Sequence, residues 1–401
     1  AFDAARPAAG LQTLAIHAGE GPDPKTGASA PNLVMSTTFI IDPDISFSAT
    51  ELGEEAPFVY TRWGNPTVDQ LERKLAALEG AEAAMAFASG MAAIAGLLLQ
   101  ILRSGDHLLM SDVSYAGSAE LVDDLLPRIG VEVTKVDLSD LDAVEEAFRP
   151  NTRLLFAETP ANPILRLVDV EALADLAHGH DVPLVVDSTF ATPIGIRPLS
   201  MGADYVVHSL TKYLSGHGDA VGGAVLGRRA DIGGLRHAIG IHMGGVMSPF
   251  NAWLTMRGMA TLPLRMRAHE EGAMTVARHL EAHPVVTRVV YPGLPSHPQY
   301  DLARRQMANF SGMLTFQTRD GEGMARRLAE RLRVIHYAVS LGHHRSLVVY
   351  LPTENLLRSS FRLTPQQEAT YRSYAGDGVF RLSVGLEDSE DLIADLDQAM
   401  A

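Results

Sequence analysis

A lysine lies among polar side chains directly after a strongly apolar run. Residues 204–210 read DYVVHSL, which is typical of a buried strand, and Ser209, Thr211 and Lys212 stand at its end. A lysine amine can form a Schiff base where its surroundings lower its pKa, and two hydroxyls can bind a phosphate. The alternative interpretation of Lys212, taken alone, is a solvated surface lysine.

Two other predicted strand ends carry groups that suit the same chemistry. Residues 83–89 run into the turn Ser89–Gly90–Met91 and then an apolar helix, whose free N–H groups and dipole favour an anion such as phosphate. Asp187 stands near the end of the apolar run 183–189. Each has a plainer alternative, because a small-residue turn is often only geometry and an aspartate often caps the next turn.

An anion cradle, a carboxylate and an amine are the three groups that pyridoxal 5'-phosphate requires. The cradle binds the phosphate, the carboxylate keeps the pyridine nitrogen protonated, and the amine holds the aldehyde. The turn at Ser89–Met91, Asp187 and Lys212 offer these groups within one chain. Their combination predicts a pyridoxal 5'-phosphate site, although each signal alone is weak.

These residues need a scaffold that brings several strand ends together. Short, nearly continuous apolar segments alternate with helical stripes such as Val170, Leu173 and Leu176, which indicates a mostly parallel sheet covered by helices on both faces. Ligands of such sheets bind beyond the carboxyl ends of the strands. Strands are predicted at residues 83–89, 107–112, 131–137, 153–159, 183–189, 204–210 and 222–227.

The composition and hydrophobic pattern along the chain predict three segments. Residues 1–60 are irregular and rich in Pro, Gly and Ser, and we expect them to form an arm that contacts a partner subunit. Residues 61–258 are expected to form a large domain that begins with a helix capped by Asn65 and ended by Gly80. Residues 259–401 mix helical stripes with short strands at 312–318 and 379–385, which indicates a smaller α+β domain.

Composition excludes several classes of protein. The 401 residues contain no cysteine, so disulfides, thiolate metal sites and a cysteine nucleophile are excluded, and the histidines show no metal-binding spacing. A formal net charge of −15 makes nucleic acid an unfavourable partner. No signal peptide or membrane-spanning stretch is recognisable, and no G-x-G-x-x-G follows the first strand. We therefore expect a cytoplasmic protein without metal, membrane or dinucleotide.

Several ordered motifs resemble the Cys/Met-metabolism family of pyridoxal-phosphate enzymes. They are YTRWGNPT, FASGMAAI, ETPANP, VVDSTFATP, GADYVVHSLTKYLSGHGDAVGG, AVSLG and RLSVGLED, and the resemblance runs from about residue 10 to the C-terminus. It implies an aspartate-aminotransferase-like fold of type I, in which a mostly parallel seven-stranded sheet lies between helices beside a smaller C-terminal α+β domain. It also implies a homotetramer, a dimer of dimers, whose active sites are shared between two chains.

The resemblance assigns the cofactor-binding roles residue by residue. It implies that Lys212 is the Schiff-base lysine and proton carrier, that Asp187 holds the pyridine nitrogen, and that Tyr115 stacks on the cofactor and acts as acid–base group near the leaving group. The other implied cofactor ligands are Ser89, Gly90, Met91, Thr189, Ser209 and Thr211.

It also implies a substrate clamp and a contribution from a second chain. Arg381 would bind the substrate α-carboxylate, assisted by Asn162 and Ser340, because the arginine fork suits a carboxylate better than lysine does. Tyr60 and Arg62 would reach into the phosphate site of the neighbouring subunit, with Tyr60 also near the substrate. A monomer should then be inactive.

The choice among family members depends on a few positions. SLG at 340–342 resembles the γ-acting enzymes, since β-acting lyases tend to have tryptophan in place of Leu341. Cystathionine γ-lyases often carry a glutamate at the position of Val59 and an acid at that of Arg345, so this chain favours a smaller or more apolar γ-substituent, as in methionine. Gly117, however, stands where methionine γ-lyases tend to have cysteine.

The expected activity is a carbon–sulfur γ-lyase that depends on pyridoxal phosphate. It would split cystathionine or methionine by α,γ-elimination to 2-oxobutanoate, ammonia and a thiol. The alternative is a γ-replacement enzyme of the cystathionine γ-synthase or O-acetylhomoserine sulfhydrylase type. Trp63 is expected near the entrance of the site, and His343 and His344 beside the substrate pocket, with no role assigned to them.

Overall fold

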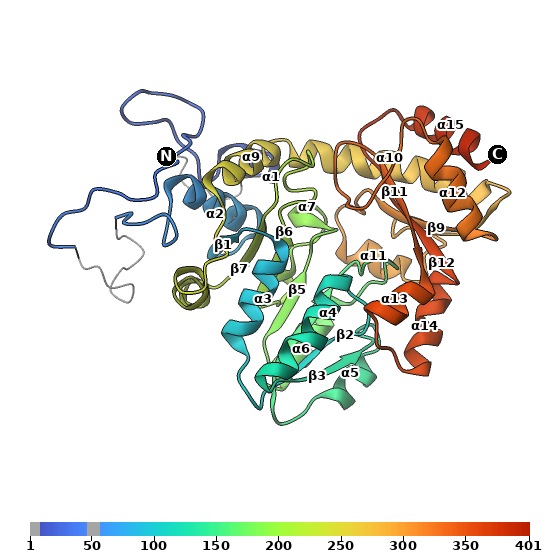
Figure 1. The fold of residues 1–401 in the computed structure, drawn as a ribbon, viewed down its shortest axis with the longest axis horizontal. Coiled ribbons are helices and arrows are strands. Elements are labelled where there is room, and N and C mark those ends of the chain that lie inside the picture. The colour runs from blue at the N-terminus through green and yellow to red at the C-terminus, as the bar shows by residue number, and fades with distance from the viewer. Residues whose placement is uncertain (1–8, 46–56) are drawn as a thin grey trace.

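The computed structural model describes residues 9–45 and 57–401 and contains two β-sheets (Figure 1). The larger sheet has seven strands in the order β1-β7-β6-β5-β4-β2-β3, and the smaller has five in the order β10-β11-β12-β9-β8. The strands of the larger sheet are β1 (Ala83–Phe87), β2 (His107–Ser111), β3 (Glu132–Val136), β4 (Thr152–Glu158), β5 (Leu184–Asp187), β6 (Tyr205–Ser209) and β7 (Gly223–Gly227).

The seven strands coincide with the seven predicted ones to within two residues at each end. β2 pairs in parallel with β3 and β4, β4 with β5, and β5 with β6, whereas β7 runs antiparallel to both β1 and β6. The prediction of a mostly parallel sheet of seven strands is therefore confirmed. Because β2, β4, β5 and β6 run the same way, their carboxyl ends meet at one edge.

Helices cover both faces of this sheet, and alternate residues of each strand contact them. Leu108 and Met110 of β2 pack on the face that carries α3 and α8, whereas Leu109 packs on the opposite face with α5 and α6. This double burial explains the nearly continuous apolar strands. The covering helices include α2 (Pro66–Glu79), α3 (Gly90–Ile101), α4 (Ala116–Asp124), α5 (Leu141–Ala147), α6 (Val170–Gly179), α7 (Thr192–Gly195), α8 (Arg229–Leu235) and α9 (Pro249–Met259).

The five-stranded sheet follows a long helix, α10 (Leu262–Ala282), which runs along the top of Figure 1 from α9 toward the smaller sheet. The core of this sheet is shared with α10, α12 (Gly321–Arg331) and α15 (Ser389–Met400), through residues such as Val276, Leu328 and Leu396. The strands are β8 (Val286–Val290), β9 (Met313–Thr318), β10 (His336–Tyr337), β11 (Leu347–Pro352) and β12 (Gly378–Ser383). The helices are α11 (Tyr300–Gln306), α12 (Gly321–Arg331), α13 (Thr353–Ser359), α14 (Pro365–Ala375) and α15 (Ser389–Met400).

One helix corrects the expectation that residues 1–60 are irregular throughout. Leu11–His17 form α1, whose Ala15 is fully buried. Lys74 of α2 fixes this helix, because its buried Nζ donates to the carbonyl oxygens of Ala15 (2.7 Å) and Ile16 (3.0 Å). Seven residues are too few to show a clear helical pattern in the sequence, and a helix of this length depends on such tertiary contacts for its stability. The rest of the predicted arm lies partly outside the described residues.

Candidate active site

A cavity of about 490 Å³ lies beyond the carboxyl ends of β1, β4, β5 and β6 and is closed on one side by residues of the smaller sheet. It brings together all the predicted site residues except Tyr60 and Arg62. Those that line it are Ser89, Gly90, Met91, Tyr115, Asn162, Asp187, Thr189, Ser209, Thr211, Lys212, Ser340 and Arg381.

Lys212 lies just after β6, with its amine directed toward the smaller sheet. Its Nζ donates to Ser340 Oγ at 3.1 Å. Burial, together with the charge of Arg381, lowers the pKa of Lys212 to about 8. A lysine of this kind exchanges protons much closer to neutral pH than a solvated one, so the surface-lysine interpretation is wrong.

The start of α3 forms one wall of the cavity. Ser89 caps the helix, with Oγ accepting from Ala92 N at 3.1 Å. A Cβ on Gly90 would lie 3.0 Å from Ser209 Cβ, and one on Gly223 only 2.3 Å from the carbonyl oxygen of Ser89. The two glycines therefore allow the helix start to lie against the end of β6, where backbone N–H groups and the Ser209 side chain line the same space.

Asp187 ends β5 and is held from one side. Its Oδ1 accepts from Thr189 N at 3.0 Å and from Thr189 Oγ1 at 2.6 Å. Burial raises the pKa of Asp187, while the hydrogen bonds from Thr189 and the nearby His208 oppose that shift. A buried carboxyl with a raised pKa at the cavity wall is suited to pair with a cationic partner.

Glu158 is a cavity residue that the sequence analysis did not assign. Its oxygens accept from the backbone N–H groups of Tyr115 (2.7 Å) and Asn162 (2.8 Å), so one side chain fixes two segments of the site. Burial, with the charge of Asp187, raises the pKa of Glu158 to about 8. The available signal was its place at the end of a predicted strand, where polar residues were expected to matter.

Arg381 lies in the middle of β12 and enters the cavity from the smaller sheet. Its Nη1 donates to Asn162 Oδ1 at 2.9 Å, and its Nη2 donates to the carbonyl oxygen of Ser340 at 3.1 Å. Within the described chain its buried Nε has no hydrogen-bond partner. Burial lowers the pKa of Arg381 to about 10, so it stays charged at neutral pH. A buried cation with an unused donor is ready to bind an anionic ligand.

Tyr115 stands at the mouth of the cavity, 46% exposed, directly before α4. Its ring packs over Gly117, where a Cβ would lie 2.6 Å from Tyr115 Cε1 and 3.2 Å from Met91 Sδ. Any larger residue at 117 has to displace the tyrosine ring. The absence of a side chain at Gly117 therefore helps to set the position of the Tyr115 ring.

Tyr60 and Arg62 lie outside the cavity of their own chain. Tyr60 is 39% exposed, and Arg62 places Cζ 5.1 Å from the centroid of the Tyr60 ring while its Nε donates to the carbonyl oxygen of Ile241 at 2.9 Å. Their predicted contribution to a second subunit stays a prediction. Trp63 lies in a separate hollow of its own chain with Phe58 and Asn65, and its expected place near the entrance of a site stays a prediction.

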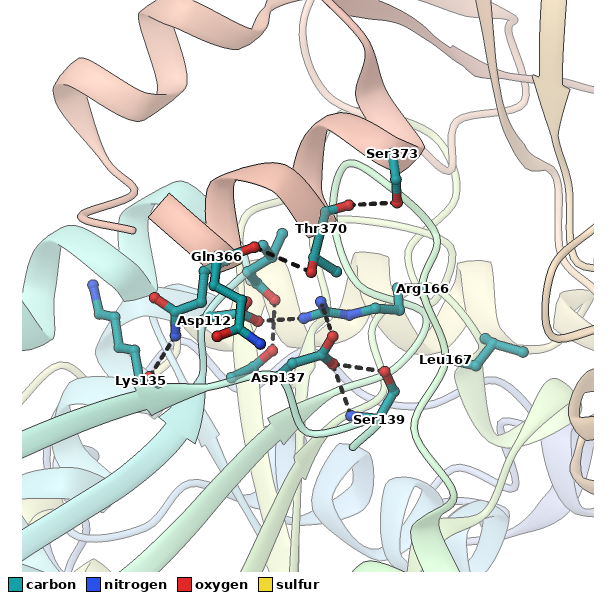
Figure 2. A network of polar contacts seen from close by, with 12 residues as sticks. Asp112, Lys135, Asp137, Ser139, Arg166, Leu167, Gln366, Thr370 and Ser373 are labelled. Atoms are coloured by element: carbon teal, nitrogen blue, oxygen red, sulfur yellow. Dashed lines mark hydrogen bonds and ion pairs between the residues drawn. The ribbon is translucent and has the colours of Figure 1, made fainter. Parts of the chain in front are cut away.

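The segment that carries Asn162 is anchored behind the cavity by a cluster of ion pairs, drawn in Figure 2. The buried Arg166 pairs with Asp112 after β2 and, at 2.8 Å, with Asp137 after β3. Gln367 of α14 donates to the carbonyl oxygen of Lys135 at 2.8 Å, which ties the smaller sheet's helix to β3. These contacts fix the loop between β4 and α6, on which Asn162 faces Arg381.

Within 9–45 and 57–401, no group of three or more histidine, aspartate or glutamate side chains is arranged to hold a metal ion. No helix in these ranges is long and apolar enough to cross a lipid bilayer.

The family model of the Cys/Met metabolism PLP-dependent enzymes matches residues 12–401. The chain belongs to this family. It is 42% identical to the canavanine gamma-lyase of Pseudomonas canavaninivorans, over 97% of this chain and 95% of the relative. It is 41% identical to the O-succinylhomoserine sulfhydrylase of Pseudomonas aeruginosa, over 98% and 96%. The solved structure of metB from Corynebacterium glutamicum superposes with a TM-score of 0.88 at 38% identity, over 100% and 99% of the two chains.

These matches confirm the type I fold and the dependence on pyridoxal phosphate. The donors in the cavity fit that cofactor: a helix start and hydroxyls for a phosphate, a buried carboxyl for a protonated ring nitrogen, and a buried amine with a lowered pKa for an aldehyde. The relatives include both a lyase and a sulfhydrylase at nearly equal identity. The similarity therefore shows the family but does not distinguish elimination from replacement.

Proposed function

We propose that the protein is a carbon–sulfur γ-lyase that splits methionine, or a similar thioether amino acid, to 2-oxobutanoate, ammonia and a thiol. One observation carries the choice of substrate. Of the described residues that line the cavity, only Glu158 and Asp187 are acidic, and both already accept hydrogen bonds from the chain. The distal ammonium group of cystathionine has no free carboxylate to meet, whereas a methyl thioether needs none.

The remaining wall of the cavity supports the same choice. The apolar residues that line it are Leu351 of β11, Leu356 of α13, and Val339 and Phe361 in the adjoining loops, and Phe361 is buried. Binding a hydrocarbon group against such a surface is favourable by roughly 25 cal/mol for each Å² of apolar surface removed from water. Arg345 stands where an acid is common among cystathionine γ-lyases, and it is exposed and lies outside the cavity, so this position supplies no carboxylate.

The cofactor-binding roles follow the positions of the residues. In this proposal the amides of Gly90 and Met91, together with Ser89, Ser209 and Thr211, hold the phosphate group. Asp187, positioned by Thr189, pairs with the ring nitrogen, and Lys212 binds the aldehyde. When bound, pyridoxal phosphate supplies a ring that withdraws electrons from the carbon next to the bound amine.

The substrate roles follow from the second set of contacts. Arg381 binds the α-carboxylate with its unused donors, while Asn162 and Ser340 fix the plane of its guanidinium group. Lys212, released from the cofactor, takes the proton from the α-carbon. A second proton then leaves from the β-carbon, and the electron pair of that C–H bond forms a carbon–carbon double bond as the γ-substituent departs. Tyr115 protonates the sulfur as the carbon–sulfur bond breaks, so the thiol leaves neutral. Tyr60 and Arg62 of the partner subunit complete the phosphate site and the substrate entrance.

The second candidate is γ-replacement on an activated homoserine ester, favoured by the sulfhydrylase relative at nearly the same identity as the lyase. Replacement uses the same clamp and the same lysine. It differs after the leaving group has departed, because a thiol then adds to the γ-carbon, where elimination adds a proton. A thiol that enters the cavity would therefore lower the yield of 2-oxobutanoate, which is released by hydrolysis when no thiol adds.

Product analysis separates the two candidates. The purified enzyme is offered methionine, cystathionine, homocysteine or O-acetylhomoserine, each with and without a thiol. The lyase proposal expects 2-oxobutanoate from methionine without added thiol, and weaker turnover of cystathionine. Turnover only with both an ester and a thiol would support replacement instead. Lys212→Ala serves as control, because it should keep the fold and abolish every one of these reactions.

A further inference from the structure

The side chains of Ser340 and His343 lie behind the Lys212 amine, and the proposed chemistry gives neither of them a role. Ser340 Oγ accepts from Lys212 Nζ at 3.1 Å and lies 3.2 Å from His343 Nε2. The three side chains therefore form a line from the cavity into the loop that follows Ser340. His343 is half-buried and does not itself line the cavity.

The hydroxyl of Ser340 has a single proton, which decides the direction of both bonds. Because Lys212 donates to Oγ, the hydroxyl proton is free to point at His343 Nε2, provided that the imidazole is neutral and carries its own proton on Nδ1. A protonated imidazole would instead donate to Oγ and leave the hydroxyl proton without either partner. The neutral imidazole is thus the state that completes the line.

The groups that face His343 favour that neutral state. Burial lowers the pKa of His343, and the charges of Lys212 and His344 lower it further, while only Asp219 acts in the opposite direction. Lys212 lies after β6, His344 is the next residue of the same loop, and Asp219 belongs to the turn before β7. Near neutral pH the imidazole is therefore neutral, and its Nδ1–H tautomer accepts from the Ser340 hydroxyl.

The local backbone holds this arrangement in place. Ser340 has a φ of 87°, a conformation that costs a non-glycine residue free energy and is typical of functional sites. Its carbonyl is held by Arg381, and His344 N donates to the carbonyl oxygen of Gly216 at 2.8 Å. A Cβ on Gly218 would lie 2.7 Å from both Nδ1 and Cε1 of His343, so the loop after Lys212 packs against this ring.

We propose that His343 is a positioning residue that orients the Ser340 hydroxyl and thereby holds the free Lys212 amine where it can carry protons. An acceptor at Nε2 polarises the hydroxyl, which makes its oxygen a better acceptor for the lysine. The inference rests on the proposed role of Lys212 and is the same for elimination and for replacement. His343 acts only through Ser340 and touches neither substrate nor cofactor.

The test measures proton transfer without the leaving group. Norleucine lacks a γ-leaving group, so exchange of its α-proton in deuterium oxide, followed by nuclear magnetic resonance, reports Lys212 as proton carrier in the holoenzyme. The variants are His343→Gln, whose side-chain amide reaches the position of Nε2, His343→Asn, which is one carbon shorter, and His343→Phe, which keeps the ring shape without an acceptor. The proposal expects Gln to keep most of the exchange rate, and Asn and Phe to lose up to about tenfold, the size of one hydrogen bond between neutral groups.

A purely structural role predicts the opposite order. If the ring only fills the space beside Gly218, His343→Phe should match the wild type and His343→Gln should be the weaker variant. That order, or equal exchange in all the variants, would overturn the proposal. If Lys212→Ala exchanges norleucine as fast as the wild type, the proposed function fails as well, so the two failures are distinguishable.

A second readout does not use the loaded enzyme. In the full chain freed of cofactor, the pH dependence of Lys212 methylation by formaldehyde and cyanoborohydride, measured by mass spectrometry, gives the pKa of the amine. We expect the wild type and His343→Gln to react with a midpoint near pH 8. His343→Phe should react with a lower midpoint, because the released hydroxyl can donate to the neutral amine and favour it. An unchanged midpoint in His343→Phe would contradict the proposal.

Discussion

Replacing Arg381 by lysine tests the substrate clamp most directly. The change keeps the positive charge on β12 and removes the planar fork that contacts Asn162 and Ser340. An ammonium group cannot offer the unused Nε donor and a parallel Nη donor to the same carboxylate. We therefore expect the variant to lose one charge-assisted hydrogen bond to the substrate carboxylate.

The size of the loss follows from that single bond. A hydrogen bond to a charged group contributes about 1.5–3 kcal/mol. Since each 1.4 kcal/mol is a factor of ten in a binding constant, the carboxylate should bind about 10- to 150-fold more weakly. The amine and the side chain of the ligand do not touch Arg381 in the proposed arrangement, so their contributions should stay unchanged.

The assay compares norleucine with pentylamine, which is norleucine without its carboxylate. Both dissociation constants are read from the absorbance change of the bound cofactor in the wild type and in Arg381→Lys. We expect the preference for norleucine to fall about 10- to 150-fold while pentylamine binds as before. The matched control is Arg305→Lys, an exposed arginine that pairs with Asp169 away from the cavity and should leave both constants unchanged. An unchanged preference in Arg381→Lys would refute the clamp, and equal weakening of both ligands would assign Arg381 a structural role.

Three further outcomes follow from the same contacts. Tyr115→Phe should slow 2-oxobutanoate release far more than it changes cofactor absorbance, and equal activity would contradict its role at the leaving group. Glu158→Gln replaces one carboxylate oxygen that accepts a backbone N–H and should lower turnover about tenfold with an unchanged circular dichroism spectrum. Burial lowers the pKa of His269 to about 4, so the unfolded chain binds the extra proton between pH 6.5 and 4. Stability should fall by about 3 kcal/mol as the pH falls through that window, and urea unfolding of His269→Gln should show a flatter pH dependence.

The sequence predicted the strand ends well, because an apolar run and the polar residue that follows it are both visible within a few consecutive residues. Asp187 and Lys212 each follow an apolar run, and parallel strands place such residues at a common edge without further information. Arg381 was assigned through the resemblance, and the structure shows why it reaches the cavity: β12 lies in the middle of the smaller sheet, which borders the site.

The contacts that sequence reasoning did not supply join segments far apart in the chain. Glu158 binds the backbone of Tyr115, and Ser340 lies between Lys212 and His343, neither of which any local pattern specifies. Helix α1 was missed for the same reason, since its carbonyl groups are held by Lys74 from another helix. Tyr60 and Arg62 show the limit of a single chain, because their predicted partner is a second subunit.

The cavity couples substrate binding to the basicity of the lysine. Two cations, Lys212 and Arg381, lie in one buried space, and the charge of Arg381 is one of the two causes that lower the pKa of Lys212. A substrate carboxylate that pairs with Arg381 cancels much of that charge, whereas the burial of Lys212 stays as it was. The pKa of the lysine therefore rises when the α-carboxylate binds, and the amine becomes a stronger base at the step in which it must take the α-proton. An amine ligand without a carboxylate leaves Arg381 unpaired and the lysine a weaker base, so pentylamine should lose its α-proton more slowly than norleucine even at saturation.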